Sequence, residues 1–182
     1  MINKIIDLMI GVLVLFTCMP VHECAHAWVA DKLGDPTAKN QGRVTLNPMA
    51  HLDLIGSICL LLSSLMGFGL GWAKPVQINP NNFKNPKLGM GLSALAGPTS
   101  NFLLAFIVMI IMRVLSFLLP NNDFGIKIVY IFYYMILLNV GLAVFNFLPI
   151  PPLDGSKILT LFLPQRIYFK IMQYEQFIFL GL

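Results

Sequence analysis

The chain has 182 residues, of which 57% are hydrophobic and only 11% are charged, and its net charge is +4. Soluble domains carry about a quarter charged residues and leave much of their surface in water, so this composition excludes a soluble fold. The positive residues are spread over the loops and are not interleaved with aromatic residues, which excludes a nucleic-acid footprint. We therefore expect an integral membrane protein embedded in the lipid bilayer, with no separate soluble domain.

The first predicted span runs over residues 5–30, because a lipid-spanning helix needs about twenty mostly apolar residues. Gly34 and Pro36 follow it and are typical of a helix end. No small-residue cleavage site follows the apolar run, so we expect a retained helix and not a signal peptide. The next residues, 37–50, are polar and contain the alternating stretch RVTL, which favours a short β-hairpin-like insert.

Residues 52–71 are apolar but are interrupted by several glycines and serines, whereas residues 72–89 hold three prolines and predict a loop. Residues 90–119 predict a second span, which Gly97-Pro98 is expected to interrupt early. A tight turn, PNNDFG, then leads to a third span over residues 126–148.

Prolines in the following segment, PIPPLDG, forbid a helix there. Residues 156–170 are expected to lie at the membrane interface. The last apolar stretch, residues 171–182, is too short to cross a membrane, which predicts a partial C-terminal helix such as a truncated chain would have.

The segment HECAH, residues 22–26, places an HExxH pattern in the first span. Histidines four residues apart lie one turn apart on the same helix face, so His22 and His26 can reach one metal ion. Glu23 can take a proton from water, and zinc suits such a set because it accepts two nitrogens, one carboxylate oxygen and a water. The alternative is a polar helix end whose histidines cap backbone groups. Ionisable residues within a membrane are costly and usually functional, which favours the metal site.

Two histidines need a third protein ligand, and Asp154 is the candidate among the remaining acids. It follows a span and lies in the proline-stiffened turn LPIPPLDG, whose non-helical backbone suits a carboxylate that points inward. The same position also suits the N-cap of a helix over GSKILTLFL. The local pattern supports these two interpretations of Asp154 equally.

Three blocks together resemble the site-2 protease family of intramembrane zinc metalloproteases: HECAH at 22–26, AGPTSN at 96–101 and NFLPIPPLDG at 146–155. The segments GDPTAKNQGRVTLNPMAHLD and GWAKPV resemble the short bacterial members, and the similarity covers about residues 20–160. One departure is Ser156, where the family often has a second glycine. We expect one metalloprotease domain over residues 1–182, with a core at about 5–160.

The resemblance implies that His22, His26 and Asp154 bind one Zn²⁺ per chain and that Glu23 is the general base. This favours the ligand interpretation of Asp154 over the N-cap.

Two asparagines, Asn146 and Asn101, are implied to lie near the substrate or its oxyanion. The alternative is hydrogen bonding between helices, which is common for asparagines in membranes. His51 and Asp53, in NPMAHLDLIG, also resemble a family block, where they would orient the metal ligands or cover the site. The residues favour the other interpretation, in which His51 and Asp53 lie in a loop and stabilise its turn.

If the first span and the turn after the third share one metal ion, they must lie at the same membrane level. Residues 52–71 then cannot cross and are expected to form a re-entrant segment covered by protein. The same arrangement places most lysines and arginines on one side, which the positive-inside rule makes cytoplasmic. We therefore expect an all-α polytopic protein of the bacterial inner membrane, with three core transmembrane helices carrying the site. The site would open towards the cytoplasm, with the N-terminus outside.

The function these features predict is an intramembrane zinc endopeptidase that hydrolyses peptide bonds in or near transmembrane helices of partner membrane proteins. The strand-like stretch 38–46 would pair with the unwound substrate by edge addition. A metal-binding transporter or sensor is the alternative, but it would be expected to have ligands along a path and often repeated halves. A catalytically dead scaffold is disfavoured because all four expected residues are present. The oligomeric state is not indicated.

Overall fold

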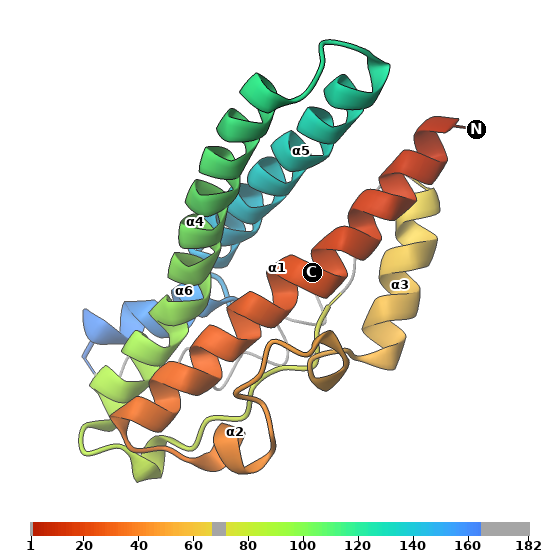
Figure 1. The fold of residues 1–182 in the computed structure, drawn as a ribbon. Coiled ribbons are helices and arrows are strands. Elements are labelled where there is room, and N and C mark those ends of the chain that lie inside the picture. The colour runs from red at the N-terminus through yellow and green to blue at the C-terminus, as the bar shows by residue number, and fades with distance from the viewer. Residues whose placement is uncertain (1, 67–71, 165–182) are drawn as a thin grey trace.

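Three long helices dominate the computed structural model, which describes residues 2–66 and 72–164. They are α1 (Ile2–Leu33), α4 (Pro86–Leu118) and α5 (Asp123–Asn146). The central element is α4, which contacts α1, α5 and the short helix α6 (Asp154–Ile158). Figure 1 shows α4 and α5 as an antiparallel pair, with α1 crossing α4 near the beginning of α4.

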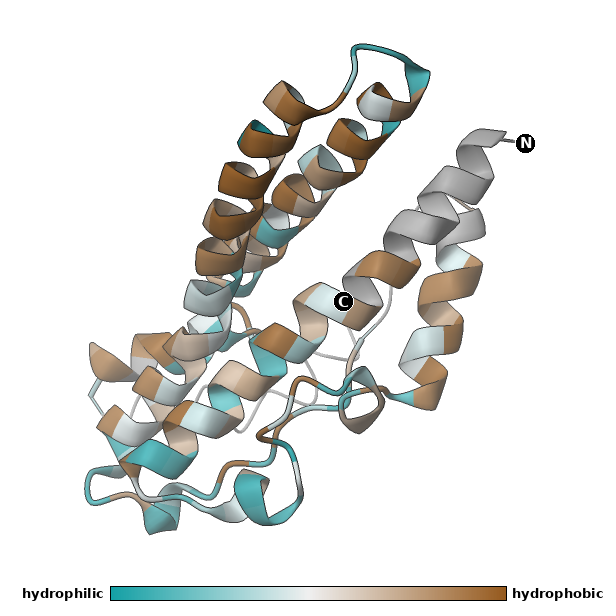
Figure 2. Cartoon of the chain, viewed as in Figure 1, coloured by the Kyte–Doolittle hydropathy of each residue, from teal (hydrophilic) through white to brown (hydrophobic). Residues whose placement is uncertain are grey.

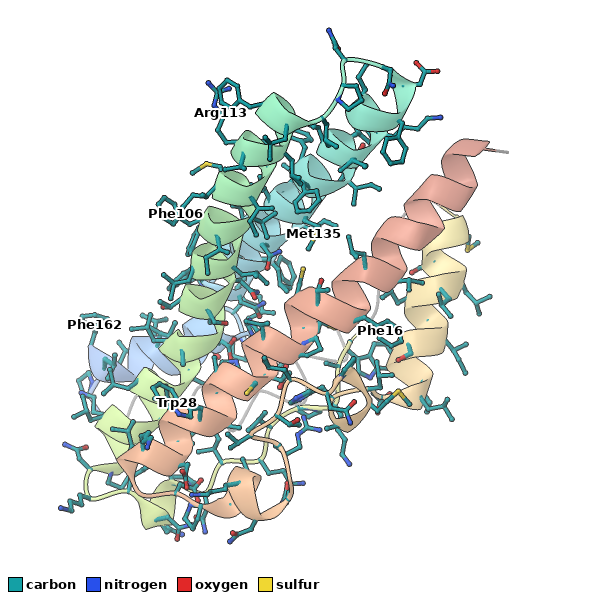
Figure 3. The ribbon with its side chains drawn as sticks, viewed as in Figure 1. Phe16, Trp28, Phe106, Arg113, Met135 and Phe162 are labelled. Carbon is teal, nitrogen blue, oxygen red and sulfur yellow. The ribbon has the colours of Figure 1, made fainter. Side chains whose placement is uncertain are left out.

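Among the described residues, α4 and α5 are the two helices that are long and apolar enough to cross a membrane. Figure 2 shows apolar residues along this pair and polar residues in the turn between them and in the loops at the opposite end. Side chains such as Phe106, which is 57% exposed, point away from the helices (Figure 3). The structure therefore confirms an all-helical protein with two candidate membrane-spanning helices, while the first expected span lies within α1.

The helices begin earlier than the sequence analysis placed them. α4 starts at Pro86 because Asn85 caps it, with its side chain accepting a hydrogen bond from Leu88 N, and proline is favoured in the first turn. Asn122 caps α5 in the same way, at Asp123. In the sequence, the asparagines and prolines near residues 85 and 122 indicate loops. In the structure, a helix starts at each of these places.

Helix α1 ends at Leu33, and Gly34 follows with a φ of 112°, a backbone conformation that favours glycine. The expected interruption of the second span at Gly97-Pro98 is wrong, because α4 continues through Pro98. A proline removes one backbone hydrogen bond, and packing against neighbouring helices compensates for that loss within a membrane.

The β-hairpin-like insert expected at residues 37–50 is also wrong. This segment forms a short helix, α2 (Thr37–Asn40), and a 3₁₀ turn, η1 (Pro48–Ala50). Within the described ranges the structure has no strand, only an isolated antiparallel bridge between Leu52 and Ala73. Hydrogen bonds from side chains, and not the backbone hydrogen bonds of a β-ladder, stabilise the backbone of this region.

The buried carboxylate of Asp35 is the first of these anchors. It accepts hydrogen bonds from the backbone N–H and hydroxyl of Thr37, from Asn79 N at 2.7 Å and from Asn82 Nδ2 at 2.6 Å. Burial raises the pKa of Asp35, but these hydrogen bonds together lower it more, so its pKa lies below its ordinary value. Asp35 therefore joins the loop after α1 to the 3₁₀ turn η2 (Pro80–Asn82).

The second anchor is Arg43, which is 4% exposed. Its guanidinium donates to the carbonyl oxygens of Ala50 and Lys74, which lie on two different loops. Lys74 N also donates to the carbonyl of His51 at 2.9 Å. Residues 34–53 and 72–85 thus form one layer, called the polar layer below.

Residues 54–65 form α3, whose 12 residues extend about 18 Å and are too short to cross a membrane of about 30 Å. The bridge between Leu52 and Ala73 places the two ends of this region side by side. Both flanks of the segment thus lie in the polar layer while α3 packs on α1, an arrangement compatible with the re-entrant segment expected at 52–71.

After α5 the chain turns sharply before α6, which a 3₁₀ turn, η3 (Leu159–Leu161), follows. A Cβ on Gly155 would lie 2.3 Å from the carbonyl oxygens of Phe147 and Leu148, so the turn closes on a residue without a side chain. The interfacial segment expected at 156–170 begins with α6 and η3, and the predicted partial C-terminal helix lies outside the described residues.

Candidate metal centre

Helix α1 presents His22 and His26 towards α4, and both side chains are buried, with 6% of each residue exposed. Their Nε2 atoms lie 3.0 Å apart, as expected for two imidazoles one helical turn apart on one face. The Nδ1–H of His26 donates to the carbonyl oxygen of Ser93 in α4 at 2.7 Å. This bond fixes the ring and leaves a lone pair on Nε2.

Asp154 comes from α6, 132 residues after His22, and completes the cluster. Its Oδ2 lies 3.1 Å from Nε2 of His22 and 3.2 Å from Nε2 of His26. The N-cap of α6 is Leu153, and no side-chain capping bond is made there. Asp154 is therefore the first residue of α6, and its carboxylate turns towards the histidines instead of capping the helix.

The three side chains fit a small cation. Their ligand atoms all lie within 4.8 Å of one another. Tetrahedral zinc with bonds of 2.0–2.1 Å would place its ligands about 3.3 Å apart, close to the observed separations. An ionised carboxylate facing imidazole nitrogens is a donor set that zinc accepts.

Gly97 lets α4 approach the two imidazoles. A Cβ at this position would lie 2.3 Å from His26 Nε2 and 2.7 Å from His22 Cε1, distances that real Cβ atoms essentially never show. Any other residue at position 97 would displace at least one histidine. The centre therefore depends on a residue that has no functional group.

A pocket of about 240 Å³ opens beside the cluster. A water molecule occupies about 30 Å³ in the liquid, so the pocket has room for several waters or a peptide group. Its walls include Glu23, Asn146 and Lys157, together with Pro75, Val76 and Ile78 of the polar layer. Groups for proton transfer and for binding a polar substrate thus share one space with the three candidate ligands.

The other predicted residues, Asn101, His51 and Asp53, are not among those that line the pocket. Asn101 is completely buried in α4, with Nδ2 3.1 Å from Nδ1 of His22, and is not among the residues that line the pocket. His51 bonds to the carbonyl of Thr45 at 2.8 Å, and the carboxylate of Asp53 accepts from Gly56 N at 2.8 Å at the start of α3. The bonds recorded for His51 and Asp53 thus stay within the polar layer and α3.

Sequence reasoning missed three contributors to this centre: the Ser93 carbonyl, Gly97 and Lys157. A backbone carbonyl leaves no signal in a sequence, since every residue carries one. Gly97 could have been found, because a glycine inside a long apolar helix is costly unless something packs closely against it. Lys157 stands one helical turn after Asp154, but in the sequence it is distinguished only as one of the charges that orient the chain in the membrane.

An all-helical membrane protein in which an HExxH pair meets a distant carboxylate is typical of membrane-bound zinc metallopeptidases. The family model "Peptidase family M50" matches residues 118–180, a stretch that contains Asp154 but neither histidine. The chain is 42% identical over 173 residues to YwhC of Bacillus subtilis (strain 168), which is named as a zinc metalloprotease. This match covers 93% of the chain and 76% of YwhC.

A second relative is Rip2 of Mycolicibacterium smegmatis, also named as a zinc metalloprotease. It is 32% identical over 139 residues, which cover 74% of the chain and 50% of Rip2. No solved structure matches the chain. Together the similarities show that the chain belongs to peptidase family M50, the site-2 protease family, and it is therefore a zinc metallopeptidase of the membrane.

Proposed function

We propose that this protein is an intramembrane endopeptidase that cleaves transmembrane segments of other membrane proteins, with one zinc ion per chain held by His22, His26 and Asp154. The convergence of these three side chains beside Glu23 is the observation that carries the proposal. The cluster is buried and yet adjoins a pocket, as a hydrolytic centre requires. When bound, zinc supplies the Lewis acidity that activates water and polarises the substrate carbonyl.

Glu23 lies in the same pocket as the three ligands, next in sequence to His22 and on the same helix. Its carboxylate accepts the proton of the attacking water and returns it to the leaving amine, the usual role of a general base. The buried positive charge of Arg43 attracts this carboxylate from the polar layer. Asn146 and Lys157, on other walls of the pocket, are placed to donate hydrogen bonds to a substrate carbonyl.

Helix α1 would be the third core span, since its 32 residues extend about 48 Å. His22 and His26 lie 11 and 7 residues before its end at Leu33, or about 16 and 11 Å along the axis. If Leu33 lies near the membrane surface, the centre is within the hydrocarbon boundary. This depth is the reason for proposing a transmembrane substrate.

A substrate helix must unwind before its carbonyl can reach the centre, because helical amides are already hydrogen-bonded. The edge expected at 38–46 is not available, since this region is helical or irregular. Residues 75–78 have no helical structure, and three of them line the pocket. We place the unwound substrate alongside this stretch.

We further propose that the polar layer faces the cytoplasm of a bacterial cell and that the turn between α4 and α5 faces outside. The support is the charge of the polar layer, which contains Lys39, Arg43, Lys74 and Lys84. In a cysteine-free background, Lys84→Cys in inverted inner-membrane vesicles should react with an impermeant maleimide, and Asn121→Cys should not. The reverse pattern would contradict the orientation.

The cleavage proposal is tested with purified protein in lipid nanodiscs and a panel of labelled transmembrane segments. Wild type should cleave at least one segment, and a zinc chelator should stop the reaction. Glu23→Gln should keep its zinc but lose about 10²–10⁴-fold in turnover, the usual contribution of a general base. Full turnover by Glu23→Gln would show that Glu23 is not the general base. Cleavage of soluble peptides alone would contradict the proposal that the substrate is a transmembrane segment.

A further inference from the structure

Asn101 contacts the candidate metal centre without lining its pocket. The side chain comes from α4, is completely buried, and places Nδ2 3.1 Å from Nδ1 of His22. Asn146, in contrast, lines the pocket and donates Nδ2 to the carbonyl of Leu142 at 2.9 Å. Asn146 therefore faces the space for a substrate, whereas Asn101 faces a candidate ligand.

A histidine binds a metal ion only through a ring nitrogen that carries a lone pair. His26 meets this condition because its Nδ1 faces the Ser93 carbonyl, which can only accept a hydrogen bond, so the proton is on Nδ1. His22 directs Nε2 towards the same Asp154 oxygen as His26 does. For His22 to bind the same ion, its proton must also be on Nδ1. The group beside Nδ1 must then be an acceptor.

The amide of Asn101 can provide that acceptor. Its oxygen and nitrogen exchange places when the amide turns by about 180°, with almost no change of shape. With Nδ2 towards His22, the buried Oδ1 has no hydrogen-bond partner among the described residues. With Oδ1 towards His22, the Nδ1–H donates to it and the lone pair of Nε2 faces Asp154.

We infer that Asn101 is a positioning residue that presents Oδ1 to Nδ1–H of His22 and so holds this imidazole in the metal-binding tautomer. The inference rests on the proposed zinc site. The two histidines then have equivalent supports from α4: the backbone oxygen of Ser93 for His26 and the side-chain oxygen of Asn101 for His22. This role differs from the substrate or oxyanion contact that the family resemblance implied.

Two substitutions separate these roles. An oxyanion donor must offer an N–H, whereas a residue that fixes the tautomer must offer an oxygen. Asn101→Asp keeps the oxygen and removes the N–H, while Asn101→Leu removes both and keeps the number and branching of the side-chain heavy atoms. Asn139→Leu is a matched control, because Asn139 is also completely buried but donates to Cys18 Sγ and the Met135 carbonyl in another part of the bundle.

The zinc affinity of each full-length protein is measured in nanodiscs by competition with a chromophoric chelator, beside cleavage of a transmembrane segment. Asn101→Leu should bind zinc about 10–100-fold more weakly, as expected when a ligating histidine loses its partner. Asn101→Asp should stay within about threefold of wild type in affinity and should still cleave. Asn139→Leu should leave the zinc affinity unchanged.

Wild-type zinc affinity in Asn101→Leu would overturn the inference. So would Asn101→Asp with normal zinc affinity and no cleavage, because that result shows a required N–H. If Asn101→Leu does not fold, Asn101→Asp decides the question through the same two measurements. The proposed function can fail separately. If Asn101→Leu weakens zinc binding but the wild type cleaves no transmembrane segment, the proposed substrate is wrong and the role of Asn101 stands.

Discussion

The two ends of the helix bundle are stabilised by different kinds of contact. At the end that carries the metal centre, α1, α4 and α6 meet through buried polar groups, and Gly97 removes the side chain that would separate them. At the opposite end, α4 and α5 pack on each other, and Phe117 and Phe124 are 73% and 65% exposed. The difference teaches that the candidate metal centre lies where protein encloses the polar groups, whereas the apolar side chains at the other end of the bundle are suited to contact with lipid.

The largest effect should come from filling the space between α1 and α4. Gly97→Ala places a methyl group where the imidazoles lie, so we expect zinc affinity to fall about 10–100-fold and cleavage to fall with it. Gly141→Ala is the matched control, because a Cβ at that position meets nothing within 4 Å. Chelator competition on both variants checks the prediction, and equal zinc affinity would show that the close approach at Gly97 is not needed.

The next effect concerns the anchor of the polar layer. Asp35→Asn should lower the free energy of unfolding by about 2 kcal/mol, because it weakens several hydrogen bonds to a buried carboxylate. The control is Asp31→Asn, which removes an ion pair with the exposed Lys39 and should cost less than about 1 kcal/mol. Chemical unfolding in nanodiscs, followed by tryptophan fluorescence, measures both. Equal losses would contradict the anchoring role.

The same anchor predicts a dependence on pH. The pKa of Asp35 lies below its ordinary value near 4. Its stabilising contribution is therefore fully present above that ordinary value and is lost as the pH falls through the lower, folded value. The difference in stability between wild type and Asp35→Asn should shrink as the pH is lowered from about 5 towards 3. A difference that grows on acidification would reverse the assigned direction.

The smallest effect is expected at the far end of the bundle. Phe117→Ala removes an exposed ring that lies 4.6 Å from the guanidinium of Arg113, a contact worth about 0.5–1 kcal/mol at an exposed site. Zinc affinity and cleavage should stay within about twofold of wild type, since surface substitutions away from special features have small effects. A tenfold loss of either would show that the two ends are coupled.

Much of this arrangement could be predicted from local patterns. Long apolar runs identify α4 and α5, and the four-residue spacing of His22 and His26 by itself indicates a shared metal ion. The place of Asp154 is different: its local pattern supports ligand and helix cap equally, and only the fold brings its carboxylate to the histidines.

The polar layer shows why the rest could not be predicted. The alternation in RVTL predicted a strand, but the buried side chains of Asp35 and Arg43 hold the backbone through contacts with residues more than thirty positions away. Such contacts leave no periodicity in the sequence. The same reason explains Asn101, whose nearness to His22 depends on how α4 packs against α1.

Zinc X-ray absorption on the purified Glu23→Gln protein tests the central claim most directly, because this variant should keep its metal. The account predicts one zinc per chain with two imidazole nitrogens and carboxylate or water oxygens at about 2.0–2.2 Å. In the additional variant Asp154→Ala, zinc should be lost or bound with one oxygen fewer. A spectrum with sulfur at about 2.3 Å, or one unchanged by Asp154→Ala, would contradict the account.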